Sequence, residues 1–184
     1  MIRKIVMYGD PVLRAVGAKI GEITDEVRTL AKDMLETMVH EDGVGLAAQQ
    51  VGFALQMAVI DVSCSEDRPS AMWVNGQSVN LADYMPMVLL NPVVELEKDK
   101  EIGSEGCLSF PKMHTDISRA AKVKCRAMML DGKELEFEAT GLLSRAVQHE
   151  VDHLNGVLFI DRMSSGAKAA WAGKLKRLQK AWKQ

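Results

Sequence analysis

The sequence predicts an α+β fold in which antiparallel sheets surround one central helix and a second helix packs outside at the C-terminus. Residues Thr140–Gly156 carry apolar side chains at three- and four-residue spacing, which is the period of an amphipathic helix. Asp131-Gly132 separates two strand-like runs, Ala121–Leu130 and Lys133–Ala139, and this dipeptide is typical of an antiparallel hairpin. Helical spacing returns in Ala167–Trp182.

Composition favours one globular domain. The chain has 184 residues, of which 47% are hydrophobic and 26% charged. No apolar run approaches the roughly 18 residues of a membrane span, and the N-terminus lacks the features of a secretory signal. The three cysteines, Cys64, Cys107 and Cys125, form no even disulfide set. We therefore expect a cytoplasmic protein that does not associate with membranes.

The net charge of −2 hides an asymmetry between the body and the tail. Residues 162–184 contain five Lys, two Arg and no acid, so they carry +7 and residues 1–161 carry −9. An apolar stripe along the predicted tail helix should hold it to the body or to a partner; it consists of Trp171, Leu175, Leu178 and Trp182. Basic side chains crowd the rest of the helix: Lys168, Lys174, Lys176, Arg177, Lys180 and Lys183. Such a helix is most often a solvated face, and it can also lie on membranes.

A helix and a glycine-rich segment come early in the chain. Thr24–His40 has a capping Thr24 and an apolar stripe, which predict a core-packing helix. Gly43–Gly52 has neither the glycine spacing of a dinucleotide-binding turn nor the Lys-Ser/Thr ending of a phosphate loop. We expect a structural turn there, in which Gly45 permits close backbone approach and Gln50 is a buried donor or faces solvent.

Strands and turns fill the middle of the chain. Leu55–Val62, Met87–Leu96 and Val157–Ile160 are predicted strands, the second bent at its Asn-Pro pair. Ser63–Pro86 is a polar excursion with a hairpin signal at its Asn-Gly pair. Glu105–Pro111 is predicted to be a compact run of turns around a cysteine.

The central helix contains the pattern His149-Glu150-x-x-His153. Residues four apart lie on one face of a helix, so both imidazoles can grip one metal ion, and Glu150 can reach a water on that ion as a base. The alternative is a polar helix face with accidental spacing. Only four His occur in the chain and two of them are here, which favours a metal-binding helix.

A catalytic metal site of this kind needs a third protein ligand. A third His six residues after His153 is excluded, because that position is Phe159. Asp161 is too close in sequence to serve as the downstream carboxylate that some enzymes use. Cys107 remains the best candidate, although a lone Cys is more often a small buried hydrophobe.

Three segments together resemble the peptide deformylase family. Gly43–Gln50 matches the motif G-x-G-L-A-A-x-Q, Glu105–Pro111 matches E-G-C-L-S-x-P, and Gln148–Gly156 matches Q-H-E-x-D-H-L-x-G. The motifs occur in the family's order, and the similarity extends over roughly the first 163 residues. This resemblance implies a catalytic domain over residues 1–163, with residues 164–184 as a basic helix of the same domain.

The resemblance implies hydrolysis of the formyl group from the N-formylmethionine that begins new polypeptides. Cys107, His149 and His153 would hold one divalent metal ion, Fe²⁺ in the usual family member, with Zn²⁺, Ni²⁺ or Co²⁺ possible in purified protein. Water on the metal would attack the formyl carbon while Glu150 moves the proton. The family stabilises the oxyanion with the side-chain amide that corresponds to Gln50 and with the backbone N–H of Leu108.

The implied substrate pocket combines family pattern with helix geometry. Leu142, Arg145 and Ala146 share a helix face with His149, so together with Val44 they are candidates to wall the methionine side chain. The backbone of Gly45 would bond the peptide as an added strand. Many family members have an Arg seven residues after the cysteine, where this chain has His114.

The resemblance also implies that the tail helix docks on the ribosome, against rRNA and surface proteins, with no role for DNA. Two other classes of function remain as alternatives. One is a Cys–His hydrolase that uses Cys107 as its nucleophile, and the other is a non-catalytic ribosome-binding module. The intact set of predicted site residues argues against the second.

Overall fold

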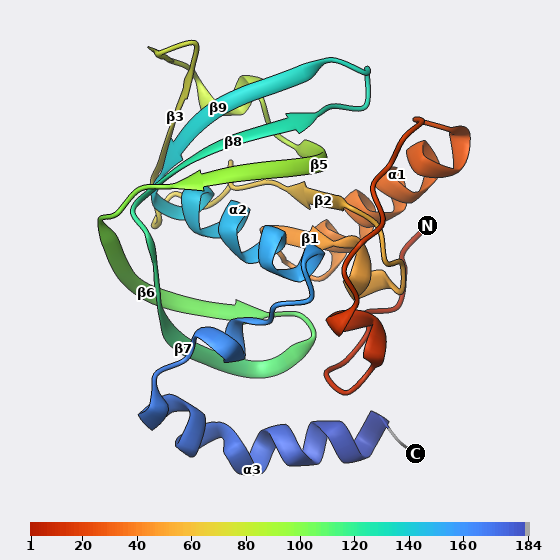
Figure 1. The fold of residues 1–184 in the computed structure, drawn as a ribbon, viewed down its shortest axis with the longest axis vertical. Helices are drawn as coiled ribbons and strands as arrows, with labels where there is room; N and C mark the ends of the chain where they lie inside the picture. Colours follow the sequence, from red (N-terminus) through yellow and green to blue (C-terminus); the bar gives the residue numbers. More distant parts are fainter. Residues whose placement is uncertain (183–184) are drawn as a thin grey trace.

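The computed structural model describes residues 1–182, which form two antiparallel sheets around helix α2 (Figure 1). The strand order is β1-β2-β5-β8-β9-β3-β4 in the seven-stranded sheet and β6-β7 in the other. The strands are β1 (Gly45–Ala47), β2 (Met57–Ile60), β3 (Ser70–Val74), β4 (Gln77–Ser78), β5 (Met87–Leu96), β6 (Lys100–Cys107), β7 (Phe110–Ala120), β8 (Lys122–Met128) and β9 (Glu134–Thr140). The longer helices are α1 (Asp25–His40), α2 (Gly141–Leu154) and α3 (Ser165–Trp182), and short 3-10 helices span Pro11–Arg14, Ala48–Val51, Leu81–Asp83 and Phe159–Arg162. The predicted α+β class is confirmed.

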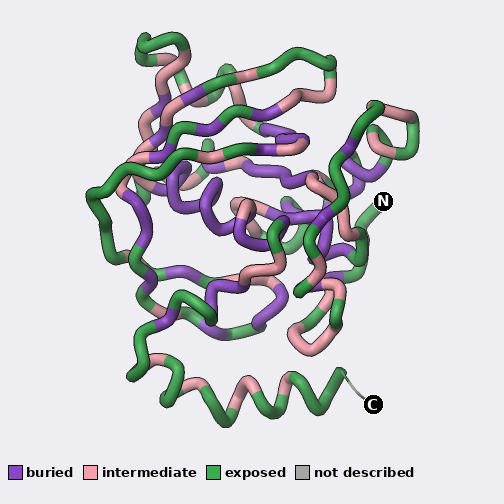
Figure 2. The backbone as a smooth tube through the Cα atoms, viewed as in Figure 1, coloured by how far each residue is buried: buried purple, intermediate pink, exposed green. Residues whose placement is uncertain are grey.

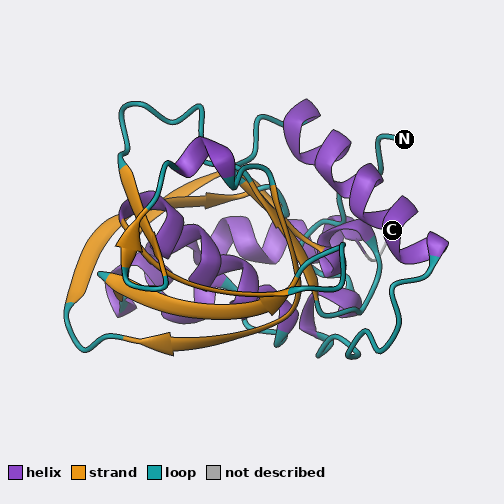
Figure 3. Ribbon diagram, turned by 90° about the horizontal axis from the view of Figure 1, so that it is seen from above, coloured by secondary structure: helices purple, strands orange, loops and turns teal. Residues whose placement is uncertain are grey.

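Helix α2 is the centre of the molecule. It contacts strands of both sheets, which curve around it (Figure 3), and twelve of its 14 residues are buried. Thr140 precedes it as predicted but makes no side-chain capping bond; instead Ser70 Oγ accepts from the N–H of Leu143 at 2.9 Å. Gly156 lies just past its end at φ 72°, where a Cβ would sit 2.4 Å from the carbonyl oxygen of Arg14. Glycine is therefore required where the chain leaves the helix.

Several predicted elements are confirmed. Thr24 caps α1 by accepting from the N–H of Val27 at 3.4 Å. The hairpins β3–β4 and β8–β9 both form. Strand β5 has the expected irregularity between Leu90 and Val93, where Asn91 takes a positive φ. The Asn91 side chain accepts from the backbone N–H of Ile20, before α1, and donates to the Ile20 carbonyl, each at 2.8 Å.

Three local predictions are wrong. Glu105–Pro111 is not a run of turns: strands β6 and β7 reach to Cys107 and from Phe110, leaving two residues at the tip. The polar sequence of β6 hides this strand, because most of its side chains face solvent and show no apolar alternation. Gly45–Ala47 is an edge strand rather than part of a turn, since β2 supplies its backbone partners. Val157–Ile160 is not a strand; a 3-10 helix covers Phe159–Arg162, and Asp161 caps it by accepting from the N–H of Leu158.

Helix α3 lies across the outside of the molecule and has no buried residue, as Figure 2 shows. Its predicted stripe does hold it to the body: Trp171, Leu175 and Leu178 pack on a cluster that contains Phe110 and Met113 of β7. The stripe ends in Trp182, which is 42% exposed and donates its indole N–H to Asp10 at 3.2 Å. The predicted contribution of Lys183 to the basic face lies outside the described residues. No helix in residues 1–182 is long and apolar enough to cross a membrane.

Candidate metal centre

Helix α2 and the tip of the β6–β7 hairpin bring a cysteine and two histidines together. The ligand atoms of Cys107, His149 and His153 all lie within 4.8 Å of one another. Cys107 Sγ is 3.3 Å from His153 Nε2. One thiolate and two imidazoles are a donor set that suits Zn²⁺, Fe²⁺ and their neighbours, so this group fits one transition-metal ion.

A buried carboxylate sets the orientation of the first histidine. Glu105 Oε2 lies 2.9 Å from His149 Nδ1, which leaves Nε2 for a metal. Burial acts to raise the pKa of Glu105, but the hydrogen bonds from His149 and Arg119 outweigh it and hold that pKa far below its usual range. Glu105 is therefore a fixed negative charge behind the proposed ligand.

A chain of ion pairs continues from Glu105 through the buried Arg119 and Asp152 to the exposed Arg162. Arg119 donates to Glu105 at 2.8 and 3.0 Å and to Asp152 at 2.5 Å. Asp152 also accepts from Arg162 at 2.5 and 2.6 Å, beyond the end of α2. Alternating charges of this kind compensate one another only while every partner is present. The network locks α2 against β6 and β7, so it fixes the relative position of the two histidines and Cys107.

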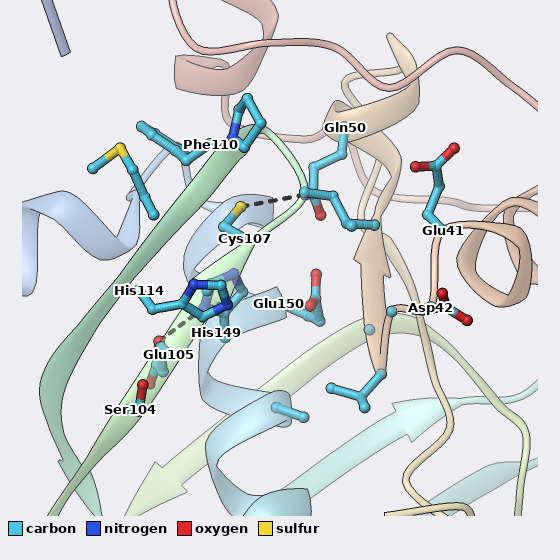
Figure 4. Close-up of a pocket in the computed structure, with 18 of the residues that line it drawn as sticks. Glu41, Asp42, Gln50, Ser104, Glu105, Cys107, Phe110, His114, His149 and Glu150 are labelled. Carbon is cyan, nitrogen blue, oxygen red and sulfur yellow. Dashed lines mark hydrogen bonds and ion pairs between the residues drawn. The ribbon is translucent and has the colours of Figure 1, made fainter. Parts of the chain in front are cut away.

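The remaining side chains of the helix motif are also buried. Burial lowers the pKa of His153 well below its usual value, which keeps the ring neutral as a metal ligand must be. Burial raises the pKa of Glu150 to about 7. Glu150 Oε2 has no hydrogen-bond partner among the described residues. Figure 4 shows Glu150 facing the cavity beside Cys107 and His149, where a water or substrate group could pair with it.

Gly45 is required by the position of Glu150. A Cβ built on Gly45 would lie 2.4 Å from Glu150 Oε1, so any other residue would displace the carboxylate or the strand. The sequence predicts close approach at this glycine, and the structure shows that the approaching group is the carboxylate of the helix motif.

The sequence predicts that Gln50 either is a buried donor or faces solvent, and in the structure it is a buried donor. It is 2% exposed. Its Nε2 lies 3.5 Å from Cys107 Sγ and 3.3 Å from Ser109 Oγ, while Oε1 accepts from the N–H of Ala47 at 3.0 Å. Leu108, the first residue of the hairpin tip, lines the same cavity. Both predicted oxyanion donors therefore lie beside the candidate metal ligands.

The cavity in front of these groups has a volume of about 550 Å³. All five residues predicted to contact substrate line it: Val44, Gly45, Leu142, Arg145 and Ala146. The guanidinium of Arg145, however, is committed to Glu105 and to the carbonyls of Ile117 and Glu101, at 2.8–3.0 Å. Arg145 thus shapes the wall but offers no free charge to a ligand.

Comparisons with known proteins point to one family. The family model for polypeptide deformylase matches residues 2–169. The chain belongs to the peptide deformylase family. The deformylase of Methylacidiphilum infernorum is 46% identical over 180 residues, covering 98% of this chain and 94% of that protein. The deformylase of Opitutus terrae is 43% identical, covering 98% and 94%.

Solved deformylases share the fold. The crystal structure from Legionella pneumophila has a TM-score of 0.80 and 32% identity, covering all of this chain and 99% of that one. The Thermotoga maritima structure has a TM-score of 0.75 and 36% identity, covering 89% and 99%. Within this deformylase fold, our sequence analysis missed the supporting network of Glu105, Arg119 and Asp152. Glu105 and Asp152 are fixed positions of two matched motifs, but Arg119 lies outside both, and the three residues come from three separate elements, so sequence spacing does not indicate that they pair.

Proposed function

We propose that this protein removes the formyl group from the N-terminal N-formylmethionine of newly made polypeptides in the cytoplasm, releasing formate. One observation carries the proposal: the cluster of Cys107, His149 and His153 lies beside Glu150, whose buried oxygen has no partner among the described residues. This arrangement is typical of metal-assisted hydrolysis. Membership of the deformylase family supports the choice of substrate.

We propose that Cys107, His149 and His153 hold one divalent ion, Fe²⁺ in the native protein and Zn²⁺, Ni²⁺ or Co²⁺ as substitutes. When bound, such an ion lowers the pKa of a coordinated water and polarises the formyl oxygen. Glu105 keeps a proton on His149 Nδ1 and so directs Nε2 towards the ion. The neutral state of His153 leaves its lone pair available for the same purpose.

Proton transfer falls to Glu150. Its carboxylate takes a proton from the attacking water and later returns it to the departing amine. Burial supports both steps, because it brings the pKa of Glu150 to about 7. The close contact with Gly45 fixes the position of the Glu150 carboxylate.

We assign two donors to the oxyanion that forms on the formyl group. The Gln50 side-chain amide is held by its bond to Ala47, and its Nε2 faces the metal cluster. The backbone N–H of Leu108 is the second donor. Loss of one such donor typically costs about 3 kcal/mol of transition-state stabilisation. Val44, Leu142, Arg145 and Ala146 wall the methionine side chain, and the Gly45 backbone pairs with the peptide.

The decisive experiment measures metal content and formate release on one anaerobically purified sample. We expect about one ion per chain and turnover of formyl-Met-Ala-Ser, both lost after chelation and restored by metal. Cys107→Asp should weaken turnover and change the preferred metal, because a carboxylate is a harder ligand than a thiolate. Full activity of metal-free protein, combined with loss of activity on alkylation of Cys107, would favour the Cys–His hydrolase instead.

The identity of the native ion has its own test. If Fe²⁺ is native, activity should decay in air and persist when Ni²⁺ or Co²⁺ replaces the iron. Stable activity of the fresh iron protein under oxygen would contradict this assignment.

We propose further that α3 binds the ribosome. The apolar stripe of α3 packs against the body of the protein. The side chains of Lys176, Arg177 and Lys180 are exposed and make no hydrogen bond or ion pair with another described residue. A face of this charge suits RNA phosphate, and such binding weakens steeply with salt because counterions are released. The proposed substrate, a new polypeptide, emerges from the ribosome. The rRNA and surface proteins of the ribosome are therefore the proposed partners of α3.

Replacement of Lys176, Arg177 and Lys180 by Gln should abolish co-sedimentation with ribosomes at low salt and leave formate release intact. A matched control replaces Lys19, Lys98 and Lys133, which lie outside α3. Equal pelleting of the variant and the wild type would rule out docking through this face.

A further inference from the structure

Polar and charged side chains from several elements line the active-site cavity. Glu41 and Asp42, between α1 and β1, line one wall, opposite Ser104 and His114 of the β6–β7 hairpin (Figure 4). Arg68, from the loop before β3, also lines the cavity. It comes from the polar excursion Ser63–Pro86, for which the sequence indicates no function.

Arg68 is anchored beside the strand that carries the metal-ligand cysteine. Its guanidinium donates to the backbone carbonyl of Ser104, in β6, at 3.2 Å. Ser104 precedes Cys107 by three residues. The bond holds the side chain at the mouth of the cavity although Arg68 itself is exposed.

Most of the donor capacity of Arg68 is unused. A guanidinium has five N–H donors, and the bond to the Ser104 carbonyl is the only hydrogen bond that the Arg68 side chain makes within residues 1–182. Arg68 forms no ion pair with an acidic residue within residues 1–182, whereas Arg119, Arg145 and Arg162 each do. A cation that is anchored, unpaired and directed at a substrate cavity is suited to bind an acceptor that arrives with the substrate.

We propose that Arg68 is a positioning residue that donates to main-chain carbonyls of the substrate peptide beyond its methionine. This inference rests on the proposed function, which places formyl-methionine in the inner cavity and leaves the rest of the peptide at the mouth. A peptide carbonyl that leaves water needs a donor, and charge-assisted bonds are the strong ones.

The test compares Arg68→Ala, Arg68→Gln and Arg68→Lys on two substrates. Formyl-Met-Ala-Ser has carbonyls beyond methionine, whereas formyl-methioninamide ends there. For the tripeptide we expect KM to rise about tenfold in the Ala and Gln variants with kcat unchanged, as for loss of one charge-assisted hydrogen bond. Lys should recover most of the loss. With formyl-methioninamide all variants should match the wild type.

The Gln variant separates positioning from a merely structural link. The Gln amide can still donate to the Ser104 carbonyl, so a purely structural link between the loop before β3 and strand β6 would survive. Binding of the substrate peptide would still be lost. Equal losses on both substrates, or a Gln variant that behaves as wild type, would overturn the inference. Lys98→Ala, on the exposed turn between β5 and β6, is the control for a general loss of positive charge.

A binding measurement keeps this inference separate from the proposed function. Absence of formate release by the wild type would refute the function. Independently, calorimetry with the product peptide Met-Ala-Ser should show about tenfold weaker binding to Arg68→Ala. Equal affinity of the two proteins for Met-Ala-Ser would refute the role of Arg68 whatever the turnover.

Discussion

Helices α2 and α3 have the same kind of apolar periodicity, but the structure uses them in opposite ways. Helix α2 lies between the two sheets, and its charged residues Arg145, Glu150 and Asp152 are all buried. Helix α3 has 18 residues, none of them buried (Figure 2), and its Lys176, Arg177 and Lys180 are exposed. The difference teaches that periodicity identifies a helix, whereas the partners available to its polar face decide whether that face becomes a site or a surface.

The largest effect should come from the carboxylate of the α2 motif. Glu150→Gln keeps the shape of the side chain but removes the base, so we expect turnover to fall roughly 100- to 10,000-fold. Metal content should stay near one ion per chain, because Glu150 is not a proposed ligand. Formate release and metal analysis on one sample check this. An apo variant, or one that turns over at the wild-type rate, would show that the base is wrongly assigned.

The ion-pair network behind α2 should give the next largest effect. Glu105→Gln weakens the orientation of His149, so we expect metal affinity to fall about 10- to 100-fold. The substitution also removes the negative charge that pairs with the buried Arg119, so the free energy of unfolding should fall by about 3 kcal/mol. Glu101→Gln, on the exposed side of the same strand, is the control and should change neither quantity.

The stability difference at Glu105 should depend on pH in a defined direction. The pKa of Glu105 in the folded protein lies far below its ordinary value of 4.5. Its contribution to stability is therefore complete above that pH and is lost as the pH falls towards the folded value. Denaturant unfolding of the metal-free proteins at pH 7 and pH 3.5 should show a smaller gap between wild type and Glu105→Gln at the lower pH. A gap that grows on acidification would contradict the ion-pair account.

A smaller effect is expected where α3 meets the body. Trp171 is only half-buried against the cluster around Phe110, so Trp171→Ala should lower the free energy of unfolding by about 1 to 2 kcal/mol. Urea unfolding measures this. A loss as large as that of Glu105→Gln would mean that α3 belongs to the core.

The smallest effect should come from the outer face of α3. Replacement of Lys176, Arg177 and Lys180 by Gln should change the free energy of unfolding by no more than about 0.5 kcal/mol, since these side chains are exposed. The same urea experiment tests it. A marked destabilisation would show that the basic face supports the fold rather than a partner.

The sequence by itself determined the parts of this protein that depend on local chemistry. Helical spacing located α2 and α3, an Asp-Gly pair located the β8–β9 hairpin, and His149, Glu150 and His153 stand on one helix turn. Elimination left Cys107 as the best third candidate ligand, and three motifs in order indicated the family.

Only the tertiary structure decided how distant residues meet. Strand β6 is too polar to be recognised from its own pattern and exists because β7 pairs with it. Glu105, Arg119 and Asp152 become a network only when two strands and a helix pack together. Gly45 is required because α2 brings Glu150 against it, and Arg68 lines the cavity where it bonds to the Ser104 carbonyl of a distant strand. Contacts of this kind depend on long-range packing, which no local pattern in the sequence encodes.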